Sequence, residues 1–189
     1  MYAGYEMQAP DAKSVRELRL EIEDFHTEYC NMLDRRDLDH WVDFFAEDAL
    51  YRITARENAD AGLRVGLVYA EGRGMIRDRA FAILHAQMFA PRYMQHLTSN
   101  VRVVSVAGSA GGAGGSVLPA PSAGAGDGSL IKAQSNYLLL QTLVDGPTTI
   151  HQSGRYYDTF VREKGRLLIR ERQCIYDTVL IANDLVYPV

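Results

Sequence analysis

The sequence has 189 residues, of which 47% are hydrophobic and 23% charged, and its formal net charge is −4. These proportions are ordinary for a globular protein, and the length fits one domain spanning residues 1–189. A net negative charge argues against a general nucleic-acid surface, which carries a basic excess. No apolar run reaches the roughly 18 residues of a membrane span, and the N-terminus has no apolar signal core. We therefore expect a soluble cytoplasmic protein.

The N-terminal region predicts one long helix after a short arm. Residues 1–13 are expected to be a flexible arm. Ser14 and Glu17 form a capping-box pattern, and apolar residues at alternating steps of three and four follow. The spacing predicts an amphipathic helix over residues 14–35, with His26 solvated at the edge of its apolar stripe.

Two more helices are predicted before the character of the sequence changes. Asp37 is a good N-cap for a short helix that places Leu38, Trp41 and Phe45 on one side. A third helix covers residues 71–88. Between them we expect a strand from about Leu50, a polar loop at residues 55–63 and a brief strand at residues 64–70.

The second half of the chain predicts β-structure. Strand-type alternation occupies residues 97–106, 130–144, 148–163 and 166–181. Gly146 and Gly165 lie in the hairpin joins, where they would supply positive φ. Long antiparallel strands after helices indicate an α+β fold in which a curved sheet wraps the helices. The glycine-rich segment 107–129 has too little apolar content to pack, which predicts a flexible loop insertion.

The sequence offers no motif for a metal or a nucleotide. Its histidines occur singly, at positions 26, 40, 85, 96 and 151. Cys30 and Cys174 do not form the paired motifs of a Rieske centre, and buried free thiols are expected. The glycine-rich segment lacks the strand-and-helix context of a dinucleotide fingerprint. We therefore predict no cofactor or metal site in this chain.

A general acid–base pocket is the remaining catalytic interpretation. A curved sheet closed by helices makes a cavity, and titratable side chains near it could move protons. The candidates are His96, Asp48, Tyr51, Asp78 and Tyr156. A structural or interfacial role for His96 is the competing interpretation.

The last predicted strand carries a mixture of residue types on both faces. Arg170 and Arg172 share a face with Leu168, Cys174 and Tyr176. Arginine and tyrosine are enriched in protein–protein interfaces, which predicts that the outer face of the sheet meets another subunit.

The chain resembles the small (β) subunits of aromatic-ring-hydroxylating dioxygenases, closest to the salicylate- and terephthalate-type members. The resemblance runs from about Leu18 to the C-terminus, and its most specific pieces are "LVYAE", "RGMIRDR" and "HLTSNVRV". It implies a cystatin-like, NTF2-like cone and an assembly of three large and three small subunits. It also implies that the large subunit holds a Rieske 2Fe–2S cluster and a mononuclear iron, while the small one supports assembly in the degradation of an aromatic acid.

Within the matching motifs, the resemblance points to polar residues that pair inside the subunit or toward its neighbours. They are Arg77, Asp78, Arg79, His96, Asn100 and Arg102. Two alternatives stay open. One is a stand-alone isomerase or dehydratase of the same fold that uses His96 with a nearby acid, and the other is a small-molecule binding module.

Overall fold

The computed structural model describes residues 4–5, 12–86, 88–107, 127–178 and 185–189. Within these ranges, six strands form one sheet in the order β2-β1-β6-β5-β4-β3. β1 and β6 are parallel, and the other neighbouring pairs are antiparallel. The strands are β1 Phe45–Ala55, β2 Val68–Glu71, β3 Arg92–Ala107, β4 Leu130–Leu143, β5 Thr148–Glu163 and β6 Arg166–Tyr176. The predicted α+β class with a mostly antiparallel sheet is confirmed.

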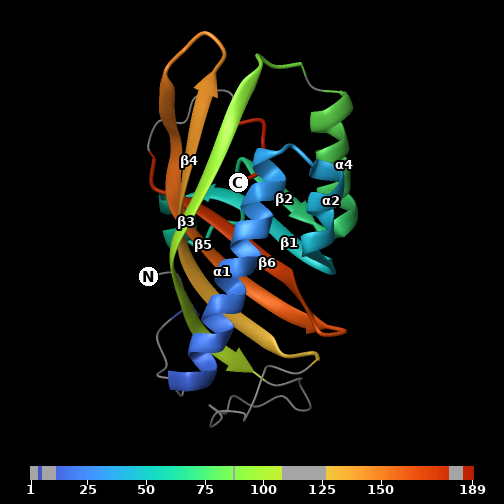
Figure 1. Cartoon of the computed structure of the whole chain (residues 1–189), viewed down its shortest axis with the longest axis vertical. Helices are drawn as coiled ribbons and strands as arrows, with labels where there is room; N and C mark the ends of the chain where they lie inside the picture. The colour runs from blue at the N-terminus through green and yellow to red at the C-terminus, as the bar shows by residue number, and fades with distance from the viewer. Residues whose placement is uncertain (1–3, 6–11, 87, 108–126, 179–184) are drawn as a thin grey trace.

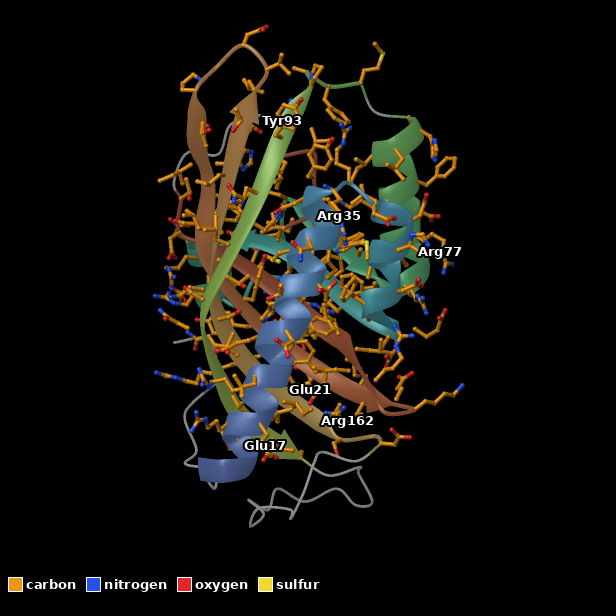
Figure 2. All side chains as sticks on the ribbon, viewed as in Figure 1. Glu17, Glu21, Arg35, Arg77, Tyr93 and Arg162 are labelled. Carbon is orange, nitrogen blue, oxygen red and sulfur yellow. The ribbon has the colours of Figure 1, made fainter. Side chains whose placement is uncertain are left out.

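The long helix α1 (Ala12–Asp34) lies across the inner face of the curved sheet (Figure 1). Its buried residues Leu18, Ile22, Tyr29 and Leu33 follow the predicted periodicity. The helix begins two residues before the predicted cap, so Ser14 lies inside it. Near its start, Glu21 accepts hydrogen bonds from Arg162 of β5 at 2.7 and 2.8 Å, which ties the helix to the sheet (Figure 2).

The other helical elements are α2 Leu38–Trp41, the 3-10 turn η1 Val42–Phe44, α3 Arg56–Asp60 and α4 Gly72–His85. Residues of α2 and α4 join the main core, whereas Ala59 of α3 packs on the other face of the sheet. Leu38, Trp41 and Phe45 are fully buried. Phe45 was expected on the short helix, but it is the first residue of β1, which begins before the predicted start near Leu50. Asp37 precedes α2 but makes no side-chain cap and instead accepts a hydrogen bond from His40. The segment 55–63, predicted as a polar loop, contains α3.

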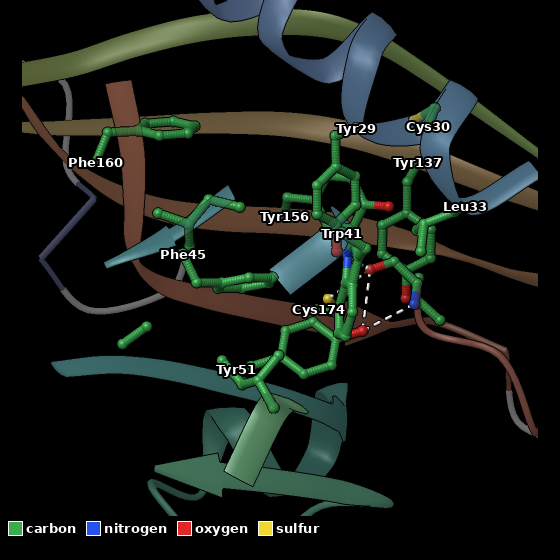
Figure 3. Packing of buried hydrophobic residues seen from close by; sticks show 14 of the residues in the cluster. Tyr29, Cys30, Leu33, Trp41, Phe45, Tyr51, Tyr137, Tyr156, Phe160 and Cys174 are labelled. Atoms are coloured by element: carbon green, nitrogen blue, oxygen red, sulfur yellow. Dashed lines mark hydrogen bonds between the residues drawn. The ribbon is translucent and has the colours of Figure 1, made fainter. Parts of the chain in front are cut away.

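The core lies between α1, α2, α4 and the inner face of the sheet. It is rich in aromatic side chains that meet edge to face, such as Trp41 with Phe45 and Tyr51 at 5.1 and 5.6 Å between ring centres (Figure 3). A smaller cluster on the outer face joins Tyr5 and Ala59 to residues of three strands: Val104, Tyr157 and Ile175.

The two hairpin glycines differ. Gly165 has φ of 76° beside Lys164 at 50°, as a tight turn between twisted strands requires. Gly146 does not adopt positive φ, so that expectation was wrong, and its amide donates to Leu143 instead. Residues 108–126 of the predicted insertion 107–129, and residues 1–3 and 6–11 of the predicted arm 1–13, lie outside the described residues.

Among the described residues, no helix is long and apolar enough to cross a membrane.

Candidate functional site

His96 of β3 is buried and makes three contacts with two other parts of the chain. Its Nδ1 lies 2.6 Å from Oδ1 of Asp34, at the end of α1, and its backbone amide donates to the same carboxylate at 3.1 Å. Its Nε2 donates to the carbonyl oxygen of Pro188 at 3.1 Å. Both ring nitrogens therefore already have partners, and neither is open to accept a proton from a substrate.

The C-terminal residues that His96 holds are themselves buried in the core. The carbonyl oxygen of Val189 accepts hydrogen bonds from the hydroxyls of Tyr29 and Tyr51, each at 3.0 Å, and the Val189 amide donates to Tyr51 at 2.8 Å (Figure 3). Burial raises the pKa of Tyr51 well above its usual value, so the hydroxyl stays protonated and donates. Tyr51 therefore anchors the chain end.

The other acid–base candidates are not gathered around His96. Asp48 is exposed on β1 and forms a 2.9 Å ion pair with Arg170 of β6. Asp78 is exposed on α4. Tyr156 is fully buried on β5, where it stacks on Tyr137 with ring centres 4.6 Å apart. The acidic side chain that contacts His96 is that of Asp34, which was not among the candidates named from the sequence.

A second polar cluster lies on the inner face of the sheet around Arg172. Its guanidinium makes two hydrogen bonds to Asp158 of β5, at 2.8 and 2.9 Å, and its carbon lies 4.2 and 4.3 Å from the ring centres of Tyr29 and Tyr156. Burial acts to lower the pKa of Arg172, but Asp158 and the two tyrosines outweigh it and raise that pKa well above its usual value. Arg172 is a charged core residue.

His26 of α1 completes this cluster, contrary to the expectation of a solvated side chain. It is 1% exposed, and its Nδ1 accepts from Arg172 at 3.2 Å. Burial, and then the charge of Arg172, lower its pKa well below the usual value, so the ring is neutral. The spacing contains the signal that was missed: Ile22, His26, Tyr29 and Leu33 follow steps of four, three and four.

A β-bulge explains why β6 mixes residue types on both faces. The pairing with β5 shifts from Phe160 opposite Ile169 to Thr159 opposite Glu171, so β6 carries one extra residue, Arg170, at this point. Ile169 and Arg172 then both face the core, although they are three residues apart. Arg172 is thus absent from the outer face on which the sequence placed it, whereas Arg170 is exposed.

The polar residues of the two specific motifs take several positions. Arg77 is exposed on α4 (Figure 2), as is Asp78. Arg79 is partly buried and donates to the carbonyl oxygen of Val186 at 3.4 Å. Asn100 and Arg102 are exposed on β3. Asn100 has φ of 56° at a register shift, a left-handed conformation that asparagine tolerates better than most residues.

Comparison with known proteins adds to this geometry. A family model described as a SnoaL-like domain matches residues 14–173. The small subunit of anthranilate 1,2-dioxygenase from Burkholderia cepacia is 32% identical over 89% of this chain and 92% of its own length. The β subunit of an aromatic-ring-hydroxylating dioxygenase of Novosphingobium aromaticivorans, known by its crystal structure, is 30% identical, with a TM-score of 0.75 over 92% of this chain and 98% of that one. The chain belongs to the β subunits of the aromatic-ring-hydroxylating dioxygenases.

The subgroup that the sequence suggested is confirmed in part. The β subunit 2 of a terephthalate 1,2-dioxygenase from Comamonas sp is 25% identical to this β subunit over 89% of the chain and 97% of its own length. The anthranilate relative, at 32%, is more similar in sequence. The salicylate resemblance stays a prediction.

The two cysteines of this β subunit are unsuited to hold iron. Cys30 and Cys174 lie on α1 and β6, and burial raises the pKa of both thiols, that of Cys30 to about 12. Protonated thiols are poor ligands, because a metal binds the thiolate. Within the described ranges, no group of three or more His, Cys, Asp or Glu side chains could hold a metal ion.

Proposed function

We propose that this β subunit has no catalytic centre of its own and supports assembly of the iron-bearing large subunit of a ring-hydroxylating oxygenase that acts on an aromatic acid. The large subunit would hold the Rieske cluster and the mononuclear iron. Three large and three small subunits would form the complex. The aromatic acid is suggested by the substrates in the names of the relatives, anthranilate and terephthalate.

The observation that carries this proposal is that both ring nitrogens of His96 already have partners within the chain. A general base needs a lone pair or proton within reach of the substrate. In His96 one ring nitrogen faces Asp34 and the other faces the carbonyl oxygen of Pro188. The imidazole instead joins α1, β3 and the C-terminal residues, which is a scaffolding role.

The second buried cluster supports the same conclusion. Asp158 holds Arg172 through two hydrogen bonds, and the two tyrosine rings cover the guanidinium faces. His26 accepts from the same guanidinium and is neutral. These side chains hold α1 against the sheet and present no pair of groups to a reacting molecule.

The test is co-expression of the β subunit with its cognate large subunit, followed by native mass measurement and assays on benzoate-type acids. We expect a complex of three large and three small subunits, with turnover that needs both chains and none from the β subunit alone. Turnover of a substrate by the purified β subunit would instead support the stand-alone isomerase or dehydratase. Failure of the two chains to associate would also overturn the proposal.

A further inference from the structure

Three buried side chains of the sheet each keep a polar atom without a hydrogen-bond partner. These atoms are Nη1 of Arg172 on β6 and, on β5, Oη of Tyr156 and Nε2 of Gln152, and none of them is bonded within the described ranges. All three side chains are 0% exposed. A buried polar group without a partner costs free energy, and native proteins satisfy nearly all such groups with protein atoms or ordered water.

The three side chains belong to one connected group. The carbon of the Arg172 guanidinium lies 4.3 Å from the ring centre of Tyr156. Tyr156 stacks on Tyr137, with ring planes 14° apart, and the Tyr137 hydroxyl donates to Oε1 of Gln152 at 2.7 Å. These contacts join Arg172 and Gln152 to the same pair of stacked tyrosine rings.

The acceptors beside these atoms already serve other donors. Both carboxylate oxygens of Asp158 accept from Nε and Nη2 of Arg172, and Nδ1 of His26 accepts from Nη2 as well. Oε1 of Gln152 accepts from the stacked tyrosine. Burial raises the pKa of Tyr156 well above its usual value, so its hydroxyl keeps a proton to donate. The unpartnered atoms therefore need an oxygen that these neighbours do not supply.

The packing around these atoms limits the size of what can bind. The guanidinium of Arg172 lies between the rings of Tyr29 and Tyr156, at 4.2 and 4.3 Å from their centres, and the rings of Tyr156 and Tyr137 are 4.6 Å apart. These are contact distances, so no further ring fits between the stacked groups. Water needs only a void of its own size and two to four polar partners.

We propose that the core of this β subunit binds ordered water that joins Nη1 of Arg172, Oη of Tyr156 and Nε2 of Gln152. The water oxygen accepts from the arginine and the amide and exchanges a hydrogen bond with the hydroxyl. Asp158 and His26 engage Nε and Nη2 of the guanidinium, so this water completes the hydrogen bonds of a fully buried charge. Burying an ion costs less when its remaining protons are bonded in this way. The water site lies within one chain and does not depend on the proposed function.

Tyr156→Phe distinguishes a hydroxyl bound to water from one that lacks a partner. If the hydroxyl binds water, phenylalanine removes a hydrogen bond and the urea midpoint should fall. If the hydroxyl has no partner, phenylalanine removes a desolvation cost and the midpoint should rise. Tyr137→Phe is the matched control, because this stacked tyrosine donates directly to Gln152 and its midpoint should fall in either case. A midpoint for Tyr156→Phe that is unchanged or higher would overturn the inference.

A crystal structure of the wild-type chain, at a resolution that places ordered waters, shows the site directly. We expect a water oxygen about 2.7–3.2 Å from Nη1 of Arg172 and from at least one of Oη of Tyr156 and Nε2 of Gln152. The absence of density there, with the surrounding side chains well ordered, would overturn the inference. Density for a larger molecule, such as a carboxylic acid kept through purification, would also overturn it.

Oxygen-17 magnetic relaxation dispersion counts long-lived internal waters in solution. We expect Tyr156→Phe with Gln152→Met to hold fewer such waters than the wild type, because two of the three partners are lost. Leu20→Ala on α1, where the side chain is 46% exposed, is the control and should keep the wild-type count. Circular dichroism establishes that each variant folds. An unchanged count in the folded double variant would contradict the proposed site.

Discussion

The sequence around His96 allowed either a catalytic or a structural role, and the contacts of this side chain in the fold favour the structural one. His96 lies beside a carboxylate, as a general base often does, but its second nitrogen is bound to the carbonyl oxygen of Pro188. The sequence indicated these two possible roles for His96, but it did not identify the residues that His96 contacts. Asp34 is 62 residues away along the chain, and no local pattern links the two.

Replacing His96 with alanine should lower the free energy of unfolding by about 1–3 kcal/mol, because Asp34 and the Pro188 carbonyl lose a buried partner. Urea unfolding of the β subunit measures this. His40→Ala is the matched control, since His40 forms a similar 2.7 Å contact with Asp37 but is exposed. Its removal should leave the midpoint unchanged at pH 8, where the contribution of a protonated His40 is lost. In the complex, turnover per intact iron site should persist. Full assembly with complete loss of turnover would favour the acid–base interpretation.

Gly154 of β5 is needed for close approach of the neighbouring strand. A Cβ at this position would lie 2.1 Å from the carbonyl oxygen of Ile175. We expect Gly154→Ala to cost about 1–3 kcal/mol of stability, as overpacking does. Gly74→Ala in α4 is the control: a Cβ there meets nothing within 4 Å, and alanine favours the helix by up to about 1 kcal/mol. Thermal melts should show a lower melting temperature for Gly154→Ala only. An equal decrease in both variants would contradict this interpretation.

At the scale of elements, α1 is joined to the rest of the fold by polar contacts at several points along its length. His26 reaches Arg172, Tyr29 reaches Val189, and Asp34 reaches His96. The elements themselves were largely predictable, because periodicity of apolar residues is local. The bulge in β6 was not, because it depends on how two neighbouring strands register. That bulge sends Arg172 inward, so the polar core could not be read from alternation alone.

The Arg172–Asp158 pair should behave as a unit. Arg172→Met leaves a buried carboxylate alone and should cost about 3–5 kcal/mol, whereas Arg172→Met with Asp158→Leu should recover most of that loss. The exposed pair of Arg170 on β6 and Asp48 on β1 is the control, and its removal should cost about 1 kcal/mol or less. Urea unfolding of the four proteins in each cycle gives the coupling energies. Equal coupling in the two pairs would contradict the buried role.

At the scale of the whole molecule, the packed core lies on the inner face of the sheet, and a smaller cluster covers part of the outer face. Large apolar side chains are exposed elsewhere, such as Leu63 and Ile150. Composition and strand length pointed to a curved sheet around helices, and the structure has that form. The exposed apolar residues could not be located from sequence, because the exposure of Leu63 or Ile150 depends on how distant segments pack and pair. Strand order is set by long-range pairing, such as that between β1 and β6.

The pH dependence of stability should report the buried cluster as a whole. The folded-state pKa of His26 is lowered by burial and then by Arg172, so between that value and 6.5 the unfolded chain binds a proton that the folded chain does not. The stability from neutral His26 is therefore complete above pH 6.5 and is lost as the pH falls toward the lower pKa, by at most about 1.4 kcal/mol per pH unit.

Urea midpoints measured from pH 8 to pH 5 test this for the wild type and His26→Gln, in which Asp158 and Arg172 still face the same position. The variant should lose the downward slope below pH 6.5. His40→Gln is the opposite control, because hydrogen bonding to Asp37 raises the pKa of His40, and its contribution is present at low pH and lost as the pH rises. A slope that survives in His26→Gln would place the titrating group elsewhere and remove His26 from the cluster that holds α1 on the sheet.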